Sequence, residues 1–186
     1  MVSANAWSRF NPLFMHENKL QPATPAGIHE VYLQPGEYFW GDATHRLKTL
    51  LGSCVAICVW HPLRHIGGMS HCLLPSRSLA QHPLPAVAEL SGRYIDETFE
   101  IFFEQMRKAG TERHEYLLKV FGGGNMFDLN DKNAATVGER NLQMMRQIVA
   151  REKIRIAAEH VGGKGHRNVI FELWSGDCWV KHAELP

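Results

Sequence analysis

Two short apolar runs joined by a tight connection constrain the fold of this chain more than any other feature of its sequence. Residues 55–60 form a continuous apolar run with β-branched residues, which is typical of a buried strand. Residues 66–74 repeat the pattern and end at Pro75, and only residues 61–65 separate the two runs. A connection of this length favours an antiparallel hairpin. The hairpin in turn predicts which side chains of its two strands lie opposite each other.

The rest of the apolar pattern predicts further strands and two amphipathic helices. Apolar residues at intervals of three and four indicate helices over residues 87–109 and 137–149, with Gly110 placed to end the first. Further strands are expected at residues 30–33, near Leu47, and at residues 116–121, 154–158, 169–174 and 178–181. Runs of strands with two inserted helices predict an α+β layered fold.

The length of the chain predicts one folded domain. A chain of 186 residues fits a single domain with a sizeable core. Residues 1–28 contain Pro12, Pro22 and Pro25 and show no sustained period, so we expect a mobile N-terminal arm there. The folded domain is then expected to span residues 29–186.

Composition argues against several classes of partner. The 20 basic residues nearly cancel the 19 acidic ones, so no broad attraction to nucleic acid or to anionic lipid is expected. Every apolar run is far shorter than the ~18 residues that span a bilayer, and the first twenty residues do not resemble a secretion signal. The four cysteines lack the spacing of a disulfide framework. We therefore expect a cytoplasmic protein with free thiols and no membrane insertion.

The predicted hairpin brings one cysteine and one histidine together. If it turns about Pro62 and Leu63, paired residues have numbers that sum to about 125, and Cys54 lies directly opposite His71. Opposed residues point to the same face, with Cβ atoms roughly 4.5–5.5 Å apart. A bulge near residues 67–68 would shift this register by one and turn His71 to the other face.

A thiol and an imidazole at this spacing can hydrolyse an amide. An adjacent imidazolium lowers the pKa of a cysteine from about 8.5 toward or below neutrality, and the thiolate is the nucleophile. The same histidine can protonate the departing ammonia and then activate the water that hydrolyses the thioester. Cys54 also follows Gly52 and Ser53 at the entrance of its strand, where backbone N–H groups can point at an oxyanion.

Other interpretations of these residues remain open at this level. Cys54 could be a small buried hydrophobe and His71 a core histidine with its hydrogen bonds satisfied. Zinc binding by His71 with Cys54, Cys58 and Cys72 is disfavoured, because no compact CxxC spacing occurs and Cys72 should face away from His71. The glycine runs at residues 122–124 and 162–165 match no nucleotide-binding motif and are expected to form turns. We therefore expect neither a metal nor an organic cofactor.

Several segments of the chain resemble one known family. Residues 49–60, TLLGSCVAICVW, and residues 66–75, IGGMSHCLLP, closely resemble the CheD family of chemoreceptor glutamine deamidases. Further matches are residues 119–126, residues 137–141, residues 161–163, Arg167 and residues 175–181. The resemblance covers roughly residues 30–182, which is nearly the whole expected domain.

This resemblance implies an activity, a site and partners. It implies that Cys54 is the nucleophile, that His71 is its base, and that Thr49 orients the histidine. It also implies a single-domain layered α/β sandwich with mixed sheets, similar to cysteine hydrolases of the cytotoxic necrotising factor type. The implied substrates are methyl-accepting chemotaxis receptors, and a CheC-type phosphatase is an implied partner.

Two alternatives to deamidation follow from the same residues. The chain could be a non-catalytic chemotaxis module that binds a phosphatase or a receptor, with an unreactive Cys54. The thioester would also support acyl transfer to an amine if water were excluded. No extended heptad pattern is present, so a monomer is expected.

Overall fold

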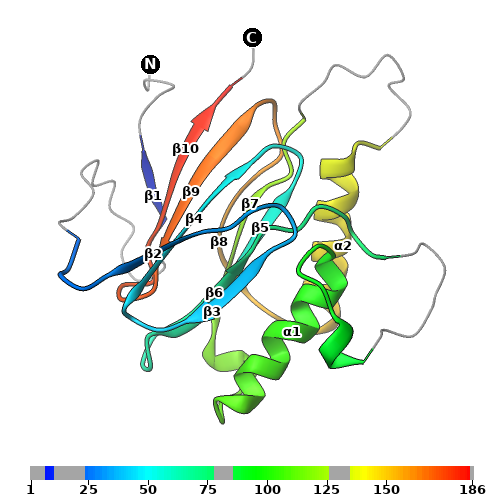
Figure 1. Ribbon diagram of the computed structural model, residues 1–186. Helices are drawn as coiled ribbons and strands as arrows, with labels where there is room; N and C mark the ends of the chain where they lie inside the picture. Colours follow the sequence, from blue (N-terminus) through cyan, green and yellow to red (C-terminus); the bar gives the residue numbers. More distant parts are fainter. Residues whose placement is uncertain (1–6, 11–23, 78–85, 126–134, 185–186) are drawn as a thin grey trace.

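Two five-stranded sheets lie face to face in the computed structural model, and two helices cover the outer side of one of them (Figure 1). The structure describes residues 7–10, 24–77, 86–125 and 135–184. Both sheets combine parallel and antiparallel pairs. The predicted α+β fold with mixed sheets is therefore confirmed.

The first sheet is formed by strands from both ends of the described chain. Its order is β1 (Ser8–Phe10), β10 (Cys178–Ala183), β9 (His166–Glu172), β4 (His45–Leu51) and β2 (His29–Tyr32). Only β2 and β4 are parallel. β1 was not predicted as a strand, and it falls within the segment expected to be an arm. Its Phe10 ring contacts Phe121 with centroids 5.5 Å apart, which attaches this edge to the core.

The second sheet has the predicted hairpin at its centre. Its order is β3 (Tyr38–Gly41), β6 (Ile66–Ser70), β5 (Val55–His61), β7 (Leu117–Gly122) and β8 (Ile156–Val161). Every residue of β5 is buried, as the continuous apolar run indicates. β3 was not predicted, because four residues next to a turn carry too little pattern to identify a strand.

The two helices are α1 (Ile95–Lys108) and α2 (Val137–Arg151). α2 begins as predicted, with a capping box between Thr136 and Glu139. α1 ends next to Gly110, which adopts a φ of 66°. The predicted start of the first helix is wrong: Val87–Glu89 form a 3-10 turn, and α1 begins eight residues later than expected.

The late start of α1 has a tertiary cause. Leu73 and Leu74 donate backbone hydrogen bonds to the carbonyl of Arg93, and Leu74 forms a bridge with Tyr94. These contacts hold the chain before Ile95 in an extended conformation. Long-range backbone pairing therefore overrides the local helical period.

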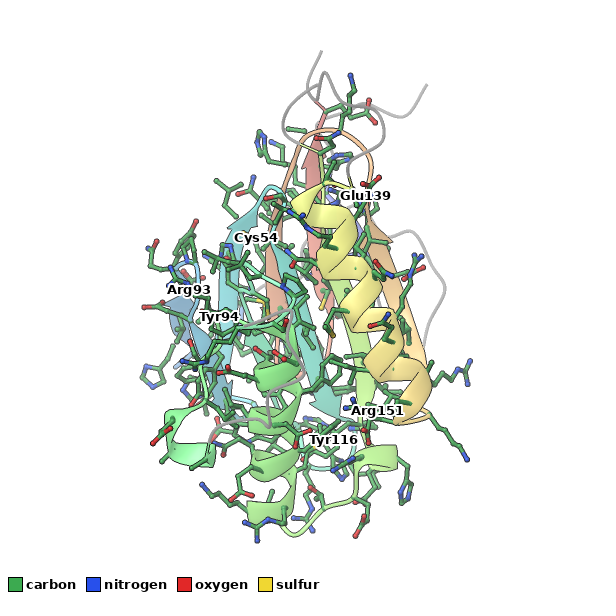
Figure 2. All side chains as sticks on the ribbon, turned by 90° about the vertical axis from the view of Figure 1, so that its right-hand side faces the viewer. Cys54, Arg93, Tyr94, Tyr116, Glu139 and Arg151 are labelled. Carbon is green, nitrogen blue, oxygen red and sulfur yellow. The ribbon has the colours of Figure 1, made fainter. Side chains whose placement is uncertain are left out.

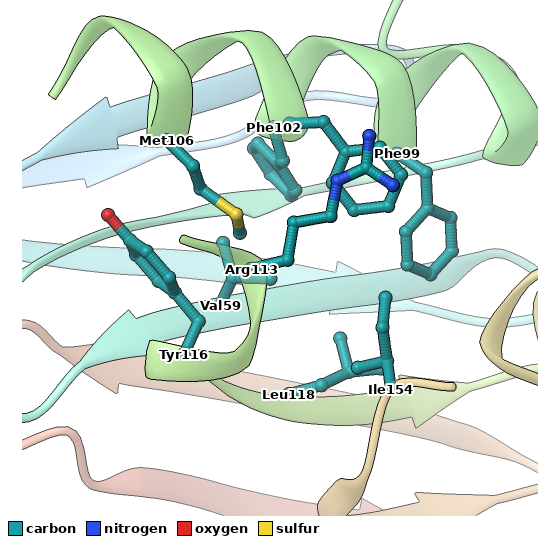
Figure 3. A pocket seen from close by; sticks show the side chains of 9 residues that line it. Val59, Phe99, Phe102, Met106, Arg113, Tyr116, Leu118 and Ile154 are labelled. Carbon is teal, nitrogen blue, oxygen red and sulfur yellow. The ribbon is translucent and has the colours of Figure 1, made fainter. Parts of the chain in front are cut away.

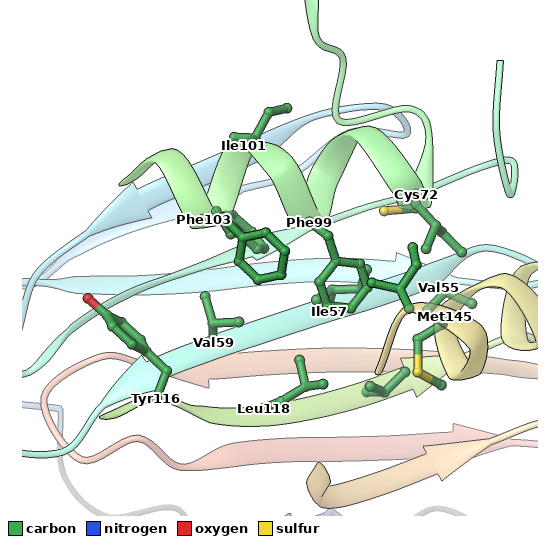
Figure 4. Close-up of a cluster of buried hydrophobic side chains, with 14 of the residues drawn as sticks. Val55, Ile57, Val59, Cys72, Phe99, Ile101, Phe103, Tyr116, Leu118 and Met145 are labelled. Atoms are coloured by element: carbon green, nitrogen blue, oxygen red, sulfur yellow. The ribbon is translucent and has the colours of Figure 1, made fainter. Parts of the chain in front are cut away.

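The alternation of β5 separates two hydrophobic cores. Val55, Ile57 and Val59 pack under the helices, in the cluster that Figure 4 shows. Ala56, Cys58 and Trp60 point the other way, into the core between the two sheets. A side chain of the hairpin therefore faces either the helices or the opposite sheet, depending on its place in the alternation.

No helix within the described residues is long and apolar enough to cross a membrane.

Candidate active site

The hairpin has a different register from the one predicted. Cys58 pairs with Met69 and His61 with Ile66, so the residue numbers of a pair sum to 127 instead of 125. The turn is a four-residue loop in which His65, at a φ of 51°, donates its N–H to the carbonyl of His61. A tight turn centred on Pro62 and Leu63 does not form, and the predicted direct opposition of Cys54 and His71 is wrong.

The shift of two residues nevertheless keeps both side chains on one face, because the side-chain period of a strand is two. Val55 pairs with Cys72, which places His71 diagonally across from Cys54. Diagonal neighbours lie about 7–8 Å apart, within reach of an imidazole. Cys54 packs against the core between the sheets, so this pair faces the first sheet.

Thr49 approaches His71 from the first sheet. It lies on β4, and its Oγ1 is 2.7 Å from His71 Nδ1. The same hydroxyl donates to the carbonyl of Leu33 at 2.9 Å. Because its only proton is used there, the hydroxyl oxygen accepts a hydrogen bond from the N–H of Nδ1. The arrangement therefore selects the tautomer in which Nε2 carries a free lone pair, as a general base requires.

The surroundings of His71 favour its neutral form. His71 is 3% exposed, and this burial lowers the pKa of its imidazole below 6.5. The Leu33 carbonyl and the charge of Glu37 raise the pKa, but by less than burial lowers it. The backbone of His71 is held on both sides, donating to the carbonyl of Glu37 and accepting from the N–H of Gly36. A neutral imidazole in a fixed position is ready to accept a proton.

Cys54 lies in the short connection between β4 and β5, and its side chain is only partly buried. Burial raises the pKa of its thiol above the ordinary value. Among the described residues the thiol has no hydrogen-bond partner, His71 included. The expected lowering of the cysteine pKa is therefore not found, since burial favours the neutral forms of both the Cys54 thiol and the His71 imidazole.

The loop that carries Cys54 is bordered by the glycine run of residues 122–124. The N–H of Gly123 donates to the Cys54 carbonyl at 2.7 Å. A Cβ on Gly122 would lie 2.2 Å from the same carbonyl oxygen, so only glycine fits there. Figure 2 shows Cys54 at the same end of the molecule as Glu139, in the first turn of α2.

The sequence analysis did not identify the contribution of α2 to this site. Asn141 Nδ2 donates to the carbonyls of Ser53 and Leu73, at 3.3 and 2.9 Å. Asn141 was noted only as part of a matching segment, and an asparagine within a helical pattern carries no local signal for such a role.

The other cysteines do not join this site. Cys72 lies on the face away from His71, as predicted, where it packs under the helices and its thiol contacts the hydroxyls of Ser70 and Thr98. Burial raises the pKa of this thiol to about 11. Cys58 and Cys178 are buried in the core between the sheets. The part of the chain that the structure describes contains no cluster of histidine, cysteine or carboxylate side chains able to hold a metal ion.

A separate pocket lies between α1 and the second sheet, on the side of β5 away from Cys54 (Figure 3). Its lining is mostly apolar: Val59, Phe99, Phe102, Phe103, Met106, Arg113, Tyr116, Leu118 and Ile154. None of these residues belongs to the Cys54 site.

Comparison with known proteins finds a family model and several relatives that share one name. Residues 73–182 match the family model described as CheD chemotactic sensory transduction. The chain is 44% identical over 158 residues to "Probable chemoreceptor glutamine deamidase CheD 3" of Dechloromonas aromatica, covering 85% of this chain and 90% of the relative. It is 42% identical over 164 residues to a protein named "Probable chemoreceptor glutamine deamidase CheD" in Pseudomonas savastanoi, covering 87% and 89%.

A third relative, at lower sequence identity, matches a similar length of this chain. "Probable chemoreceptor glutamine deamidase CheD 1" of Leptospira interrogans is 34% identical over 166 residues, covering 86% of this chain and 96% of the relative. The family model begins at residue 73, after Thr49, Cys54 and His71. The similarity to whole relatives extends over most of the chain.

Proposed function

The chain belongs to the CheD family, and from this premise we propose that it is a chemoreceptor glutamine deamidase that hydrolyses glutamine side chains to glutamate. The activity is that of a protein-glutamine amidohydrolase with a cysteine nucleophile. The substrates are methyl-accepting chemotaxis receptors, in keeping with the names of the relatives.

One observation carries the mechanism, namely the buried hydrogen bond of 2.7 Å between Thr49 Oγ1 and His71 Nδ1. It joins the two sheets, orients the imidazole and leaves Nε2 available on the face that Cys54 shares. We assign Cys54 as nucleophile, His71 as general base and acid, and Thr49 as the residue that orients His71.

The reaction follows from these assignments. The sulfur of Cys54 attacks the carboxamide carbon of glutamine while Nε2 of His71 takes the thiol proton. The tetrahedral intermediate collapses to a thioester as the imidazolium protonates the leaving nitrogen, which departs as ammonia. Water then attacks the thioester with His71 as base, releasing glutamate and restoring the thiol.

We also propose the compartment, the oligomeric state and a partner of the protein. The protein acts in the cytoplasm as a monomer and also binds a CheC-type phosphatase. Its layered domain, which β1 joins as an edge strand, is related in fold to cysteine hydrolases of the cytotoxic necrotising factor type. The small residues Gly52 and Ser53 beside the nucleophile leave room for a helix of the receptor to approach.

One observation favours a second function. Burial raises the pKa of Cys54, so the resting thiol is not activated. That property suits a non-catalytic module that binds a receptor or a phosphatase. The deamidase is the better account because the relatives that match most of this chain are named for that activity.

The test is the intact mass of a chemoreceptor cytoplasmic fragment after incubation with the protein. Deamidation adds about 1 Da per modified glutamine, and we expect this gain to be lost in Cys54→Ala and His71→Ala. The matched control is Cys178→Ala, which removes a buried thiol outside the site and should keep the activity. No mass change with wild type, together with a Cys54 inert to alkylation, would overturn the deamidase and leave the binding module as the better account.

A further inference from the structure

Hydrogen bonds hold the backbone on both sides of Ser53. The carbonyl of Gly52 accepts from the N–H of Gly124 at 2.9 Å, and the carbonyl of Cys54 accepts from the N–H of Gly123 at 2.7 Å. These donors come from the turn that follows β7. The carbonyl of Ser53 lies between them, and a side chain holds it instead of the backbone.

That side chain is Asn141, on the second turn of α2. Its Nδ2 donates to the Ser53 carbonyl at 3.3 Å and to the Leu73 carbonyl at 2.9 Å. Leu73 lies two residues after His71. One amide group therefore fastens the residue before the nucleophile to the segment that follows the base.

Because the Ser53 carbonyl and the Cys54 N–H belong to the same peptide, the hydrogen bond from Asn141 also fixes the direction of the Cys54 N–H. In a trans peptide the C=O of one residue and the N–H of the next point in opposite directions, and no cis peptide occurs in the described chain. With its Ser53 carbonyl held against Asn141, this peptide directs the Cys54 N–H away from α2. Among the described residues no acceptor meets this N–H or that of Ser53.

An unoccupied N–H on the nucleophile itself is suited to bind the oxyanion of a tetrahedral intermediate. We propose that Asn141 is a positioning residue that aims the Cys54 N–H at this oxyanion by holding the Ser53 carbonyl. The proposal rests on the deamidase function and adds to it a residue outside the nucleophile, base and orienting threonine.

The surroundings of Asn141 support a role for its donors. Its residue is 0% exposed, and its Oδ1 has no hydrogen-bond partner among the described residues. A buried amide with an unmatched oxygen is unfavourable for packing alone. The helix is also held close, since a Cβ on Gly138 would lie 2.5 Å from the Gly123 oxygen. Asn141 is therefore anchored firmly enough to position a peptide.

The experiment compares two reactions of the same thiol in Asn141→Asp and Asn141→Leu. Both variants preserve the approximate size of the side chain and remove its N–H donors. Deamidation of a receptor fragment forms an oxyanion, whereas alkylation of Cys54 by iodoacetamide does not. We expect kcat for deamidation to fall about 10- to 100-fold, with the alkylation rate of Cys54 within about threefold of wild type.

The control variant is Ile148→Ala on the same helix, which removes a buried side chain of the helix-side core. It should lower thermal stability while the ratio of the two rates stays at the wild-type value. Peptide mapping of the alkylated protein reports folding at the same time, because Cys58, Cys72 and Cys178 are buried and react only when the chain opens.

Two results would overturn the proposal while the deamidase remains. Unchanged deamidation in both Asn141 variants is one, and a fall in Cys54 alkylation parallel to the fall in deamidation is the other, since it would show general damage to the loop. No deamidation by the wild-type protein would instead refute the proposed function. Deamidation that survives Cys54→Ala would refute the assignment of Cys54 as nucleophile, and either result would remove this inference.

Discussion

The two faces of the β5–β6 hairpin carry the same kinds of side chain in different arrangements. On the face toward the first sheet, a hydroxyl, that of Thr49, contacts an imidazole and leaves the thiol of Cys54 without a partner. On the face toward the helices, the hydroxyls of Ser70 and Thr98 contact the thiol of Cys72 directly. The same residue types form a candidate active site on one face and core packing on the other.

The position of a thiol along the strand therefore decides whether a substrate can reach it. Cys72 lies in the fully buried interior, where its thiol is held by two hydroxyls and its pKa is raised to about 11. Cys54 precedes β5 and remains partly accessible. Access for a substrate, more than a low pKa of the resting thiol, distinguishes the two cysteines.

Replacement of Cys54 and of Cys72 by alanine gives the largest expected difference between the two faces of the hairpin. Cys54→Ala should lower the rate of receptor deamidation by at least ~10⁴-fold, because no other group can form the thioester. Cys72→Ala should keep the activity and lower the free energy of unfolding by about 1 kcal/mol, since Ser70 and Thr98 retain backbone partners. Mass spectrometry of the receptor and urea denaturation measure the two effects. Equal losses of activity would remove the distinction between the faces.

The hydroxyls provide a second test. Thr49→Val preserves shape but removes the closer partner of His71 Nδ1 and leaves only the Leu33 carbonyl at 3.5 Å. We expect kcat to fall about 10- to 100-fold because the imidazole is held less firmly. Thr98→Val makes the same change on the helix face, and its kcat should stay within about twofold of wild type. Steady-state ammonia release measures both. A Thr49→Val enzyme with full activity would contradict the assigned role.

The pH dependence of deamidation tests whether His71 acts as a neutral base. His71 must be neutral to accept the thiol proton, and burial lowers its pKa below 6.5. Activity should therefore be retained at pH 6.5 and fall about tenfold per pH unit only once the pH is below this lowered pKa. A profile of kcat/KM from pH 4.5 to 8 measures it. An acid limb centred above pH 6.5 would show that the imidazole is stabilised in its charged form.

The same shift predicts a smaller effect on stability. Because the folded state disfavours protonated His71, the unfolded chain binds more protons between the lowered pKa and 6.5. The contribution of His71 is present above pH 6.5 and is lost as the pH falls through that interval. His71→Gln should flatten this part of the curve of unfolding free energy against pH, which urea denaturation at several pH values would reveal. If the slope of unfolding free energy against pH is the same in His71→Gln and wild type, a group other than His71 causes it.

Much of the fold was predictable because it depends on local periods. β5, β7, β9, β10 and α2 were expected within a few residues of where they lie. The errors arose where contacts distant in sequence prevail. Residues before Ile95 pair with Leu74 instead of joining the helix, and β1 becomes a strand only because β10 provides an edge.

The sequence predicted that Cys54 and His71 share a face of the hairpin on the condition that the register shifts by an even number, because the side-chain period of a strand is two. The register itself, and with it this condition, depends on the backbone conformation of a four-residue loop in the folded chain. The tertiary structure also decided the contact of Thr49 with His71, the raised pKa of Cys54 and the position of Asn141. These features join segments from different sheets and from a helix, and the amino-acid pattern of a single strand carries no information on what packs against it.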